Sequence, residues 1–300
     1  MCGFTIKNNL FGAMAARRHG IPFLPNVTGL GTVFLGSRAL FQLGRTLYRI
    51  ALAKSRIVFV QNADDRDFLV ANAILRADQL RLLPGSGIDT QRFAQVPLPG
   101  EPEGPSFLMI SRLLRDKGIV EYLEAARWLK VERPGVQVRL LGPLGSNNRT
   151  AIGRDDLQPF IDDGSVAYLG ETDDVRPFIA AADCVVLPSY REGAPRSLIE
   201  AASMGRPLVA TDVPGCRAVV DDALTGFLCP AKDSAGLGEA MRRVADLTPA
   251  ERQAMGDAGR AKMVREYSVS HVVDAYRNAI AELTSQARND LADAGARERK

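Results

Sequence analysis

Apolar and polar positions alternate along the first third of the chain in a way typical of strands separated by helices. Short apolar runs predict strands, and the amphipathic stretches around them predict helices. The strands are expected at 21–27, 56–62 and 79–85, and the helices near 8–19, 37–54 and 63–76. This order indicates part of an α/β lobe.

The segment AQVPLPGEPEGP, residues 94–105, is rich in proline and glycine and predicts a linker. The alternation restarts after it with almost wholly apolar runs, which are typical of parallel strands covered by helices on both faces, so the second lobe is expected to be doubly wound. Strands are expected at 105–112, 136–142, 165–170, 184–189, 207–211 and 226–230, and helices near 118–130, 155–162, 173–181, from 196, and near 233–247, 250–265 and 268–285.

The last residues, 287–300, predict a frayed and solvated tail. Three hundred residues correspond to about two domains at roughly 150 residues each. We therefore expect two lobes, at 1–97 and 98–270, followed by a C-terminal helix and charged tail at 271–300.

Composition excludes several classes of protein. The four cysteines form no C-x-x-C pair and the only histidines are His19 and His271, so neither a zinc cage nor a disulfide framework is expected. No apolar run reaches the roughly 18 residues of a membrane span, and the start MCGFTIKNN lacks the pattern of a signal peptide. A cytoplasmic protein is expected.

The charge is distributed unevenly. The chain carries a net +3, yet residues 1–63 hold eight basic side chains and no acidic one. The helix expected at 37–54 places Arg38, Arg45 and Arg49 near one side, with Phe41, Leu47, Tyr48 and Ile50 available for packing. This helix either rests on an anionic membrane surface or is a core helix whose arginines extend into water. Nucleic acid is not an expected partner, because aromatics are only 6% of the chain and no recognition motif accompanies the charge.

The stretch YREGAPRSLIEAASMG, 190–205, follows an apolar strand and begins a helix near Pro195. Ligands of doubly wound sheets bind at the carboxyl ends of the strands, and free N–H groups of a helical first turn favour phosphate. Gly193 and Ala194 would let a ligand approach the backbone closely. Glu200 would accept hydrogen bonds from a diol such as ribose, and Glu192 from another polyol. Phosphate, ribose and sugar together indicate a nucleotide sugar.

Two cations supply the matching positive charge. Arg112 follows the first strand of the second lobe and Lys117 begins the next helix, so both could hold a diphosphate. No D-x-D metal motif with a plausible strand-end setting is evident, and we expect these cations to replace a divalent metal. Taken singly, Arg112 and Lys117 would be ordinary surface charges and Glu200 a solvated helix residue.

The combined motifs resemble the donor lobe of the retaining glycosyltransferases of family 4, which have the GT-B fold of two Rossmann-like doubly wound lobes. The resemblance rests on R-x4-K in SRLLRDK, E-x7-E in EGAPRSLIE, the following GRPLVATDVPG and GFLCP, and SGIDTQRF at the end of the first lobe. It implies that Arg112 and Lys117 contact the donor diphosphate, Glu192 the transferred sugar and Glu200 the ribose. It also implies that backbone around four residues contacts sugar and phosphate: Gly193, Ala194, Arg196 and Ser197.

Finer motifs resemble one branch of the family. PSYREGAPRSLIEA, TDVPGCR, TGLGTVF and FTIKNNLFG are similar to segments of bacterial enzymes that add a sugar, often an N-acetylhexosamine from a UDP donor, to a polyprenyl-diphosphate-linked acceptor. The resemblance implies surface-glycan assembly at the cytoplasmic face of the inner membrane, with no cofactor and no metal. Asn8 stands where the branch usually has proline, and Pro195 where many relatives have glycine.

The first lobe is expected to be truncated. Relative to a lobe of roughly 150 residues, about 80 residues would be missing before FTIKNNLFG, including the glycine-rich loop of the family. No nucleophile is evident, so front-side transfer through an oxocarbenium-like state is expected. Two alternatives remain open: a GT-B-fold epimerase of a UDP-sugar, and an inactive remnant that only binds the nucleotide sugar.

Overall fold

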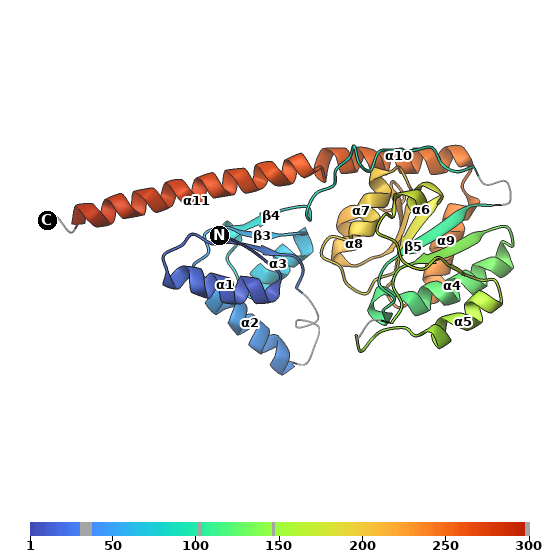
Figure 1. Ribbon diagram of the computed structural model, residues 1–300, viewed down its shortest axis with the longest axis horizontal. Coiled ribbons are helices and arrows are strands. Elements are labelled where there is room, and N and C mark those ends of the chain that lie inside the picture. The colour runs from blue at the N-terminus through green and yellow to red at the C-terminus, as the bar shows by residue number, and fades with distance from the viewer. Residues whose placement is uncertain (31–37, 101–103, 146–147, 298–300) are drawn as a thin grey trace. The chain divides into compact units, whose positions relative to one another are not determined.

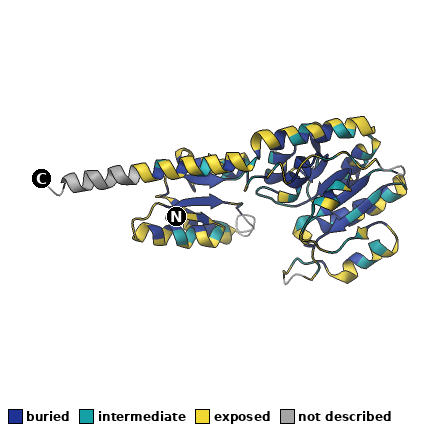
Figure 2. Ribbon diagram, turned by 45° about the horizontal axis from the view of Figure 1, so that its top comes forward, coloured by how far each residue is buried: buried dark blue, intermediate teal, exposed yellow. Residues whose placement is uncertain are grey.

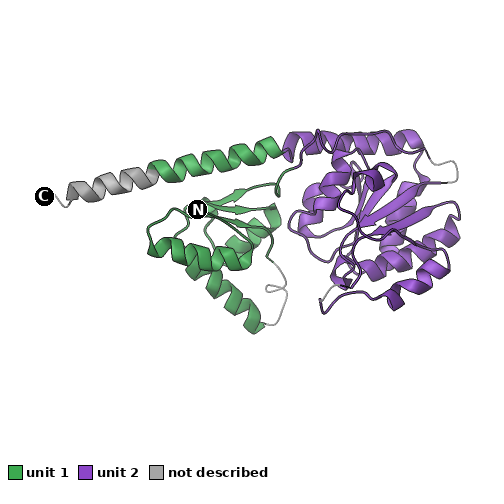
Figure 3. Ribbon diagram, viewed as in Figure 1, with its two compact units in different colours: residues 1–87, 269–300 green, residues 88–268 purple. Residues whose placement is uncertain are grey.

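The computed structural model describes the backbone of the chain except residues 31–37, 101–103, 146–147 and 298–300. The chain forms two compact units (Figure 3). Unit 1 comprises Met1–Gly87 and Val269–Lys300, and unit 2 comprises Ile88–Ser268. Each unit has its own parallel sheet and core, so the predicted α/β class is confirmed.

Unit 1 contains a sheet of four parallel strands in the order β1-β2-β3-β4 (Figure 1). Three of them are the predicted strands, and the first was not predicted. The strands are β1 (Cys2–Phe4), β2 (Leu24–Val27), β3 (Val58–Val60) and β4 (Leu80–Leu82), and the helices between them are α1 (Ile6–Arg18), α2 (Arg38–Leu52), α3 (Ala63–Ala71) and the short 3-10 helix Ala77–Gln79.

The two faces of this sheet carry separate apolar clusters, because successive side chains of a strand point to opposite sides. Val58 and Val60 belong to a cluster with buried residues of α1, α2 and α3. Ile57 and Phe59 belong to the other cluster, together with residues of the last helix, α11 (Val269–Arg297). In this second cluster the Tyr276 ring lies 5.0 Å from that of Phe59, and its hydroxyl accepts a hydrogen bond from Asn26 at 2.8 Å.

Helix α11 differs from the sequence prediction in two respects. It packs against the sheet of unit 1, whereas 271–300 was expected to be a separate segment. It also continues to Arg297, where a frayed tail from 287 was expected. The residues from 287 to 294 include alanine, arginine and leucine and no proline or glycine, so intrinsic propensity favours continuing the helix.

Unit 2 contains a parallel sheet of six strands in the order β10-β9-β8-β5-β6-β7. The first strand of this unit, β5, lies in the middle of the sheet. The next two strands, β6 and β7, follow on one side of it, and the chain then returns to form β8, β9 and β10 on the other side. This reversal defines a doubly wound sheet. All six strands were predicted: β5 (Ser106–Ile110), β6 (Gln137–Leu141), β7 (Ala167–Tyr168), β8 (Cys184–Leu187), β9 (Leu208–Thr211) and β10 (Gly226–Cys229).

Helices cover both faces of this sheet, and its central strands are almost completely buried (Figure 2). α4, α5 and α9 pack together on one face, and α7, α8 and α10 pack together on the other. The short helix α8 was not predicted. The helices are α4 (Ile119–Glu132), α5 (Arg154–Asp162), α6 (Arg176–Ala180), α7 (Arg196–Ser203), α8 (Pro214–Val219), α9 (Ser234–Asp246) and α10 (Pro249–Glu266), with a 3-10 turn at Arg115–Lys117.

Residues 88–97 belong to unit 2, although they were assigned to the first lobe by sequence. The reason is a buried cation. Arg206 is fully buried and donates to the carbonyl oxygens of Pro97 at 2.8 Å and of Ala182 at 3.1 Å. Burial lowers the pKa of Arg206 to about 10, so the side chain still carries its charge at neutral pH. The guanidinium therefore ties this segment to the sheet. The predicted linker, 94–105, includes residues 101–103, which lie outside the described residues.

Replacing this cation tests its role. The variant Arg206→Met is expected to lower the free energy of unfolding of unit 2 by roughly 3 kcal/mol, because buried carbonyls lose charged donors. Denaturant unfolding followed by fluorescence of the single tryptophan, Trp128 on α4, reports this unit. The control Arg242→Met removes a surface cation paired with Glu239 and is expected to leave the midpoint nearly unchanged. Equal midpoints for the two variants would contradict the role of Arg206.

Candidate functional site

The predicted site residues converge at the point where the strand order of unit 2 reverses. β5 and β8 are neighbours in the sheet, although β6 and β7 come between them in the chain. The loops after these two strands leave the same edge of the sheet and diverge to opposite sides. A crevice therefore forms at their carboxyl ends, where ligands of doubly wound folds bind.

A hollow of about 270 Å³ lies in this crevice. Six of the eight predicted site residues line it, together with Ser111, which was not predicted. From the β5 side come Ile110, Ser111, Arg112 and Lys117, and from the β8 side come Leu187, Glu192, Pro195, Arg196, Ser197 and Glu200. Ser111 directly follows β5, so its position at a strand end was the available signal for it.

Lys117 and Glu192 form an ion pair across the hollow, joining the β5 loop to the β8 loop. The pair is largely shielded from water, because the side chains of Lys117 and Glu192 are only 23% and 12% exposed. Arg112 differs: it is exposed, and among the described residues no ion pair to it is found. The hollow is thus lined by one cation held in an ion pair, Lys117, and by one cation exposed to solvent, Arg112.

Helix α7 begins at the hollow without a side-chain cap. Pro195 precedes it in an extended conformation and provides no capping oxygen, so the N–H groups of the first turn remain available to a ligand. Glu200 lies one turn inside, accepts a hydrogen bond from Arg196 Nε at 2.6 Å and is only 7% exposed. Burial raises the pKa of Glu200 above its usual value, and the hydrogen bond from Arg196 acts in the opposite direction.

Gly193 and Ala194, also predicted to contact a ligand, do not line the hollow. Gly193 lies where its loop meets α8. Gly215 belongs to α8, and a Cβ on Gly215 would be 2.6 Å from the carbonyl oxygens of both Gly193 and Glu192. Ala194 packs against the core of unit 2. Gly215 was missed because nothing in its sequence context indicates such a close approach.

Close backbone contacts fix the two loops to each other. Gly118 ends the 3-10 turn at φ 76°, and a Cβ there would lie 2.1 Å from the carbonyl oxygen of Pro188. The backbone N–H of Tyr190 donates to the carbonyl of Asp116 at 3.0 Å, and the Ser189 hydroxyl donates to the same carbonyl at 3.2 Å. The positions of Lys117 and Glu192 therefore depend on the packing between these loops.

The second unit also matches a known protein family by sequence. Residues 104–246 match the family model described as "Glycosyl transferases group 1". These residues form a glycosyl transferases group 1 domain. All six strands of unit 2 and its helices from α4 to α9 fall entirely within the match.

Two relatives with described activities cover more of the chain than this domain. The N,N'-diacetylbacillosaminyl-diphospho-undecaprenol alpha-1,3-N-acetylgalactosaminyltransferase of Campylobacter jejuni is 29% identical over 78% of this chain and 64% of its own length. The UDP-Gal:alpha-D-GlcNAc-diphosphoundecaprenol alpha-1,3-galactosyltransferase of Escherichia coli is 24% identical over 80% and 64%. The chain thus spans less than two thirds of the length of these relatives.

Solved structures extend the likeness to the fold. Anabaena Alr3699/HepE in complex with UDP matches with a TM-score of 0.79 at 18% identity, over 94% of this chain and 78% of that one. Sucrose-phosphate synthase from Thermosynechococcus elongatus matches with a TM-score of 0.77 at 23% identity, over 94% and 73%. The predicted GT-B fold is confirmed by these structures, and the match of residues 104–246 agrees with the predicted kind of enzyme, a glycosyltransferase. The branch motif TGLGTVF at 28–34 falls partly on residues 31–34, outside the described residues.

The contact between the loops can be tested at Gly118. The variant Gly118→Ala is expected to lower the free energy of unfolding of unit 2 by at least about 2 kcal/mol, because alanine is strained at positive φ and its Cβ meets Pro188. Gly164→Ala is the matched control, since Gly164 has φ 74° but no atom within 4 Å of its Cβ position. Equal loss in both variants would mean that the contact contributes nothing.

Burial of Glu200 predicts a pH dependence of stability. The pKa of Glu200 is raised in the folded state, so at pH values between the unfolded and the folded pKa the folded protein holds a proton that the unfolded chain has lost. The free energy of unfolding therefore falls as pH rises through this interval. Glu200→Gln removes this titration. The stability of wild type relative to Glu200→Gln should therefore increase on acidification, which urea unfolding across mildly acidic pH would measure. A pH-independent difference would contradict the raised pKa.

Proposed function

We propose that the chain is a retaining glycosyltransferase that moves a sugar from a UDP-sugar to a saccharide linked to polyprenyl diphosphate, in the assembly of a bacterial surface glycan. The observation that carries the proposal is the hollow at the reversal of the unit 2 sheet. There, three cations, two carboxylates and an uncapped helix N-terminus face one space. These groups match the diphosphate, sugar and ribose of such a donor.

Each group has a proposed role in binding the donor. Arg112 and Lys117 would contact the diphosphate, whose remaining charge favours the first-turn N–H groups of α7. Glu200, held near the start of α7, would accept hydrogen bonds from the ribose hydroxyls. Glu192 would do the same for the transferred sugar. Backbone groups around Gly193, Ala194, Arg196 and Ser197 would complete the contacts.

The chemical step would proceed on one face of the sugar. The bond from the anomeric carbon to the diphosphate breaks, and its electron pair stays on the diphosphate oxygen. The acceptor oxygen then bonds to the same face of the carbon, and its proton passes to the departing diphosphate. Arg112, Lys117 and the α7 N-terminus would stabilise the charge that develops there, so no metal is required.

The acceptor is assigned by analogy with the relatives. Both relatives named above carry diphospho-undecaprenol in the name of their acceptor. No helix in the described part of the chain is both long and apolar enough to cross a bilayer. A chain acting on an acceptor linked to polyprenyl diphosphate would meet it at a membrane surface, which we propose to be the cytoplasmic face of the inner membrane. The epimerase alternative gains no support, because neither His19 nor His271 lines the hollow.

The proposed role of Lys117 is tested by transfer. With radiolabelled UDP-sugars and a polyprenyl-diphosphate-linked acceptor, Lys117→Ala is expected to lower kcat by about 10²- to 10³-fold, because charge on the leaving diphosphate loses a positioned donor. Lys130→Ala, on α4 of the same unit and outside the hollow, is the control. An unchanged rate in Lys117→Ala would overturn the role. The anomeric configuration of the product, read by NMR, decides between retention and inversion.

A further inference from the structure

Helix α2 of unit 1 leaves large apolar side chains in water. Four leucine and isoleucine side chains are 41% to 56% exposed and recur three or four places apart, so they form one row: Leu40, Leu43, Leu47 and Ile50. The opposite side of the helix is buried through Gly44, Tyr48, Ala51 and Leu52. Leu47 and Ile50 were expected to be available for packing; in the structure they are exposed, and Tyr48 is buried.

A second row on α2 is cationic. At about 100° per residue, Arg38, Arg45 and Arg49 fall on the other border of the outward side, and Gln42 and Thr46 lie between the two rows. Arg38 and Arg49 are exposed. We call the two rows together the α2 surface. A mixed apolar and cationic face of this kind is typical of helices that lie in the boundary between lipid headgroups and acyl chains.

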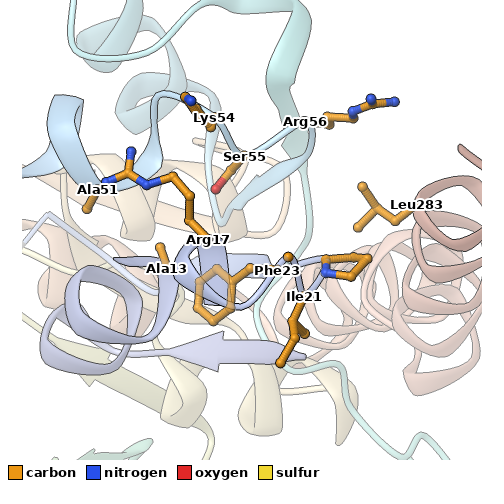
Figure 4. Close-up of a pocket in the computed structure, with 11 residues that line it drawn as sticks. Ala13, Arg17, Ile21, Phe23, Ala51, Lys54, Ser55, Arg56 and Leu283 are labelled. Carbon is orange, nitrogen blue, oxygen red and sulfur yellow. The ribbon is translucent and has the colours of Figure 1, made fainter. Parts of the chain in front are cut away.

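Two hollows continue the α2 surface beyond the end of the helix, both within unit 1. The first, about 260 Å³, is lined by Arg17, Lys54, Ser55 and Arg56 together with the apolar Phe23 and Leu283. Figure 4 shows Arg17 extending from α1 toward the end of α2 at Ala51, with Lys54, Ser55 and Arg56 on the loop that follows α2.

The second hollow, about 810 Å³, shares Arg17 and Lys54 with the first. It adds Arg49 and the exposed Ile50 from the α2 surface, and Val70 from α3. Among the described residues no acidic side chain lines either hollow, and the sequence from Met1 to Ala63 contains none. The α2 surface and the hollows thus form one continuous region of positive charge beside exposed apolar side chains.

We propose that the α2 surface and these two hollows form the docking surface of unit 1 for an anionic lipid bilayer. In this proposal the apolar row of α2 contacts the acyl chains, and the cations around the hollows bind lipid phosphates. Charge complementarity selects this occupant, because a second copy of the same cationic surface would repel it. The inference deepens the proposed attachment to a membrane, but it concerns lipid binding and not transfer.

Vesicle sedimentation tests the proposal with the whole chain. Wild type is expected to bind vesicles of phosphatidylcholine mixed with phosphatidylglycerol, to bind phosphatidylcholine vesicles much more weakly, and to be released by high salt. The double variant Arg49→Gln with Lys54→Gln should lose about fivefold in affinity for each cation. The matched control, Arg149→Gln with Arg154→Gln, removes two exposed cations of unit 2 and should bind as wild type does.

The apolar row is tested separately. The double variant Leu43→Glu with Leu47→Glu should reduce binding to the level seen with phosphatidylcholine alone, whereas Val131→Glu, which changes a residue 75% exposed on α4, should not. Thermal midpoints equal to wild type establish that each variant is folded. Absence of wild-type binding to both kinds of vesicle, or equal binding to both, would overturn the proposal.

Two further measurements separate the alternatives. Sedimentation equilibrium reports the oligomeric state. If wild type is a dimer that does not bind vesicles, and the Leu43→Glu with Leu47→Glu variant is a monomer, the surface belongs to a second copy of the chain and the proposal is overturned. Lys117→Ala should bind vesicles as wild type does. Unchanged transfer by Lys117→Ala with vesicle binding intact would therefore count against the donor site alone, and normal UDP binding with no vesicle binding would count against the docking surface alone.

Discussion

The candidate site depends on the close packing of two loops at the centre of the unit 2 sheet. β5 and β8 are adjacent although β6 and β7 come between them in the chain, and the turn after β5 rests directly on the backbone after β8. Gly118 permits this contact because any Cβ would overlap the carbonyl of Pro188. Without the contact, Lys117 and Glu192 would stand on independent loops. Their ion pair, the hollow and the start of α7 are consequences of this one approach between backbones.

The charges in the hollow differ in how tightly they are held. Lys117 is paired with Glu192, and Glu200 is buried beneath Arg196, so both carboxylates already have a cationic partner. Arg112 and Arg196 face solvent. Three cations against two carboxylates leave the hollow with an excess positive charge among its lining residues. An anionic ligand would thus meet cations fixed by the protein and others that can still adjust their rotamers, which suits a site that must release a product.

Much of the fold and most of the site follow from local sequence. Apolar runs located all six strands of unit 2, and strand ends located Arg112, Lys117, Glu192 and Glu200. Features set by distant contacts were not predictable. Residues 88–97 join unit 2 through the buried Arg206, and α11 joins unit 1 because the sheet face at Phe59 needs an apolar cover. The exposure of Leu47 was missed for the same reason, since an apolar row on a helix does not reveal whether a partner covers it.

Unit 2 is a single continuous stretch of chain, whereas unit 1 is assembled from both ends. Gly87 packs against Val269 within unit 1, and the backbone N–H of Ile88 donates to the carbonyl of Tyr267 at 2.8 Å within unit 2. The chain therefore leaves unit 1 and re-enters it at neighbouring points, which is the topology of an inserted domain. Residues 88–268 could be excised with their ends side by side, and the remaining segments rejoined by a short peptide. The two units are in this sense genetically separable, although neither is confined to one half of the sequence.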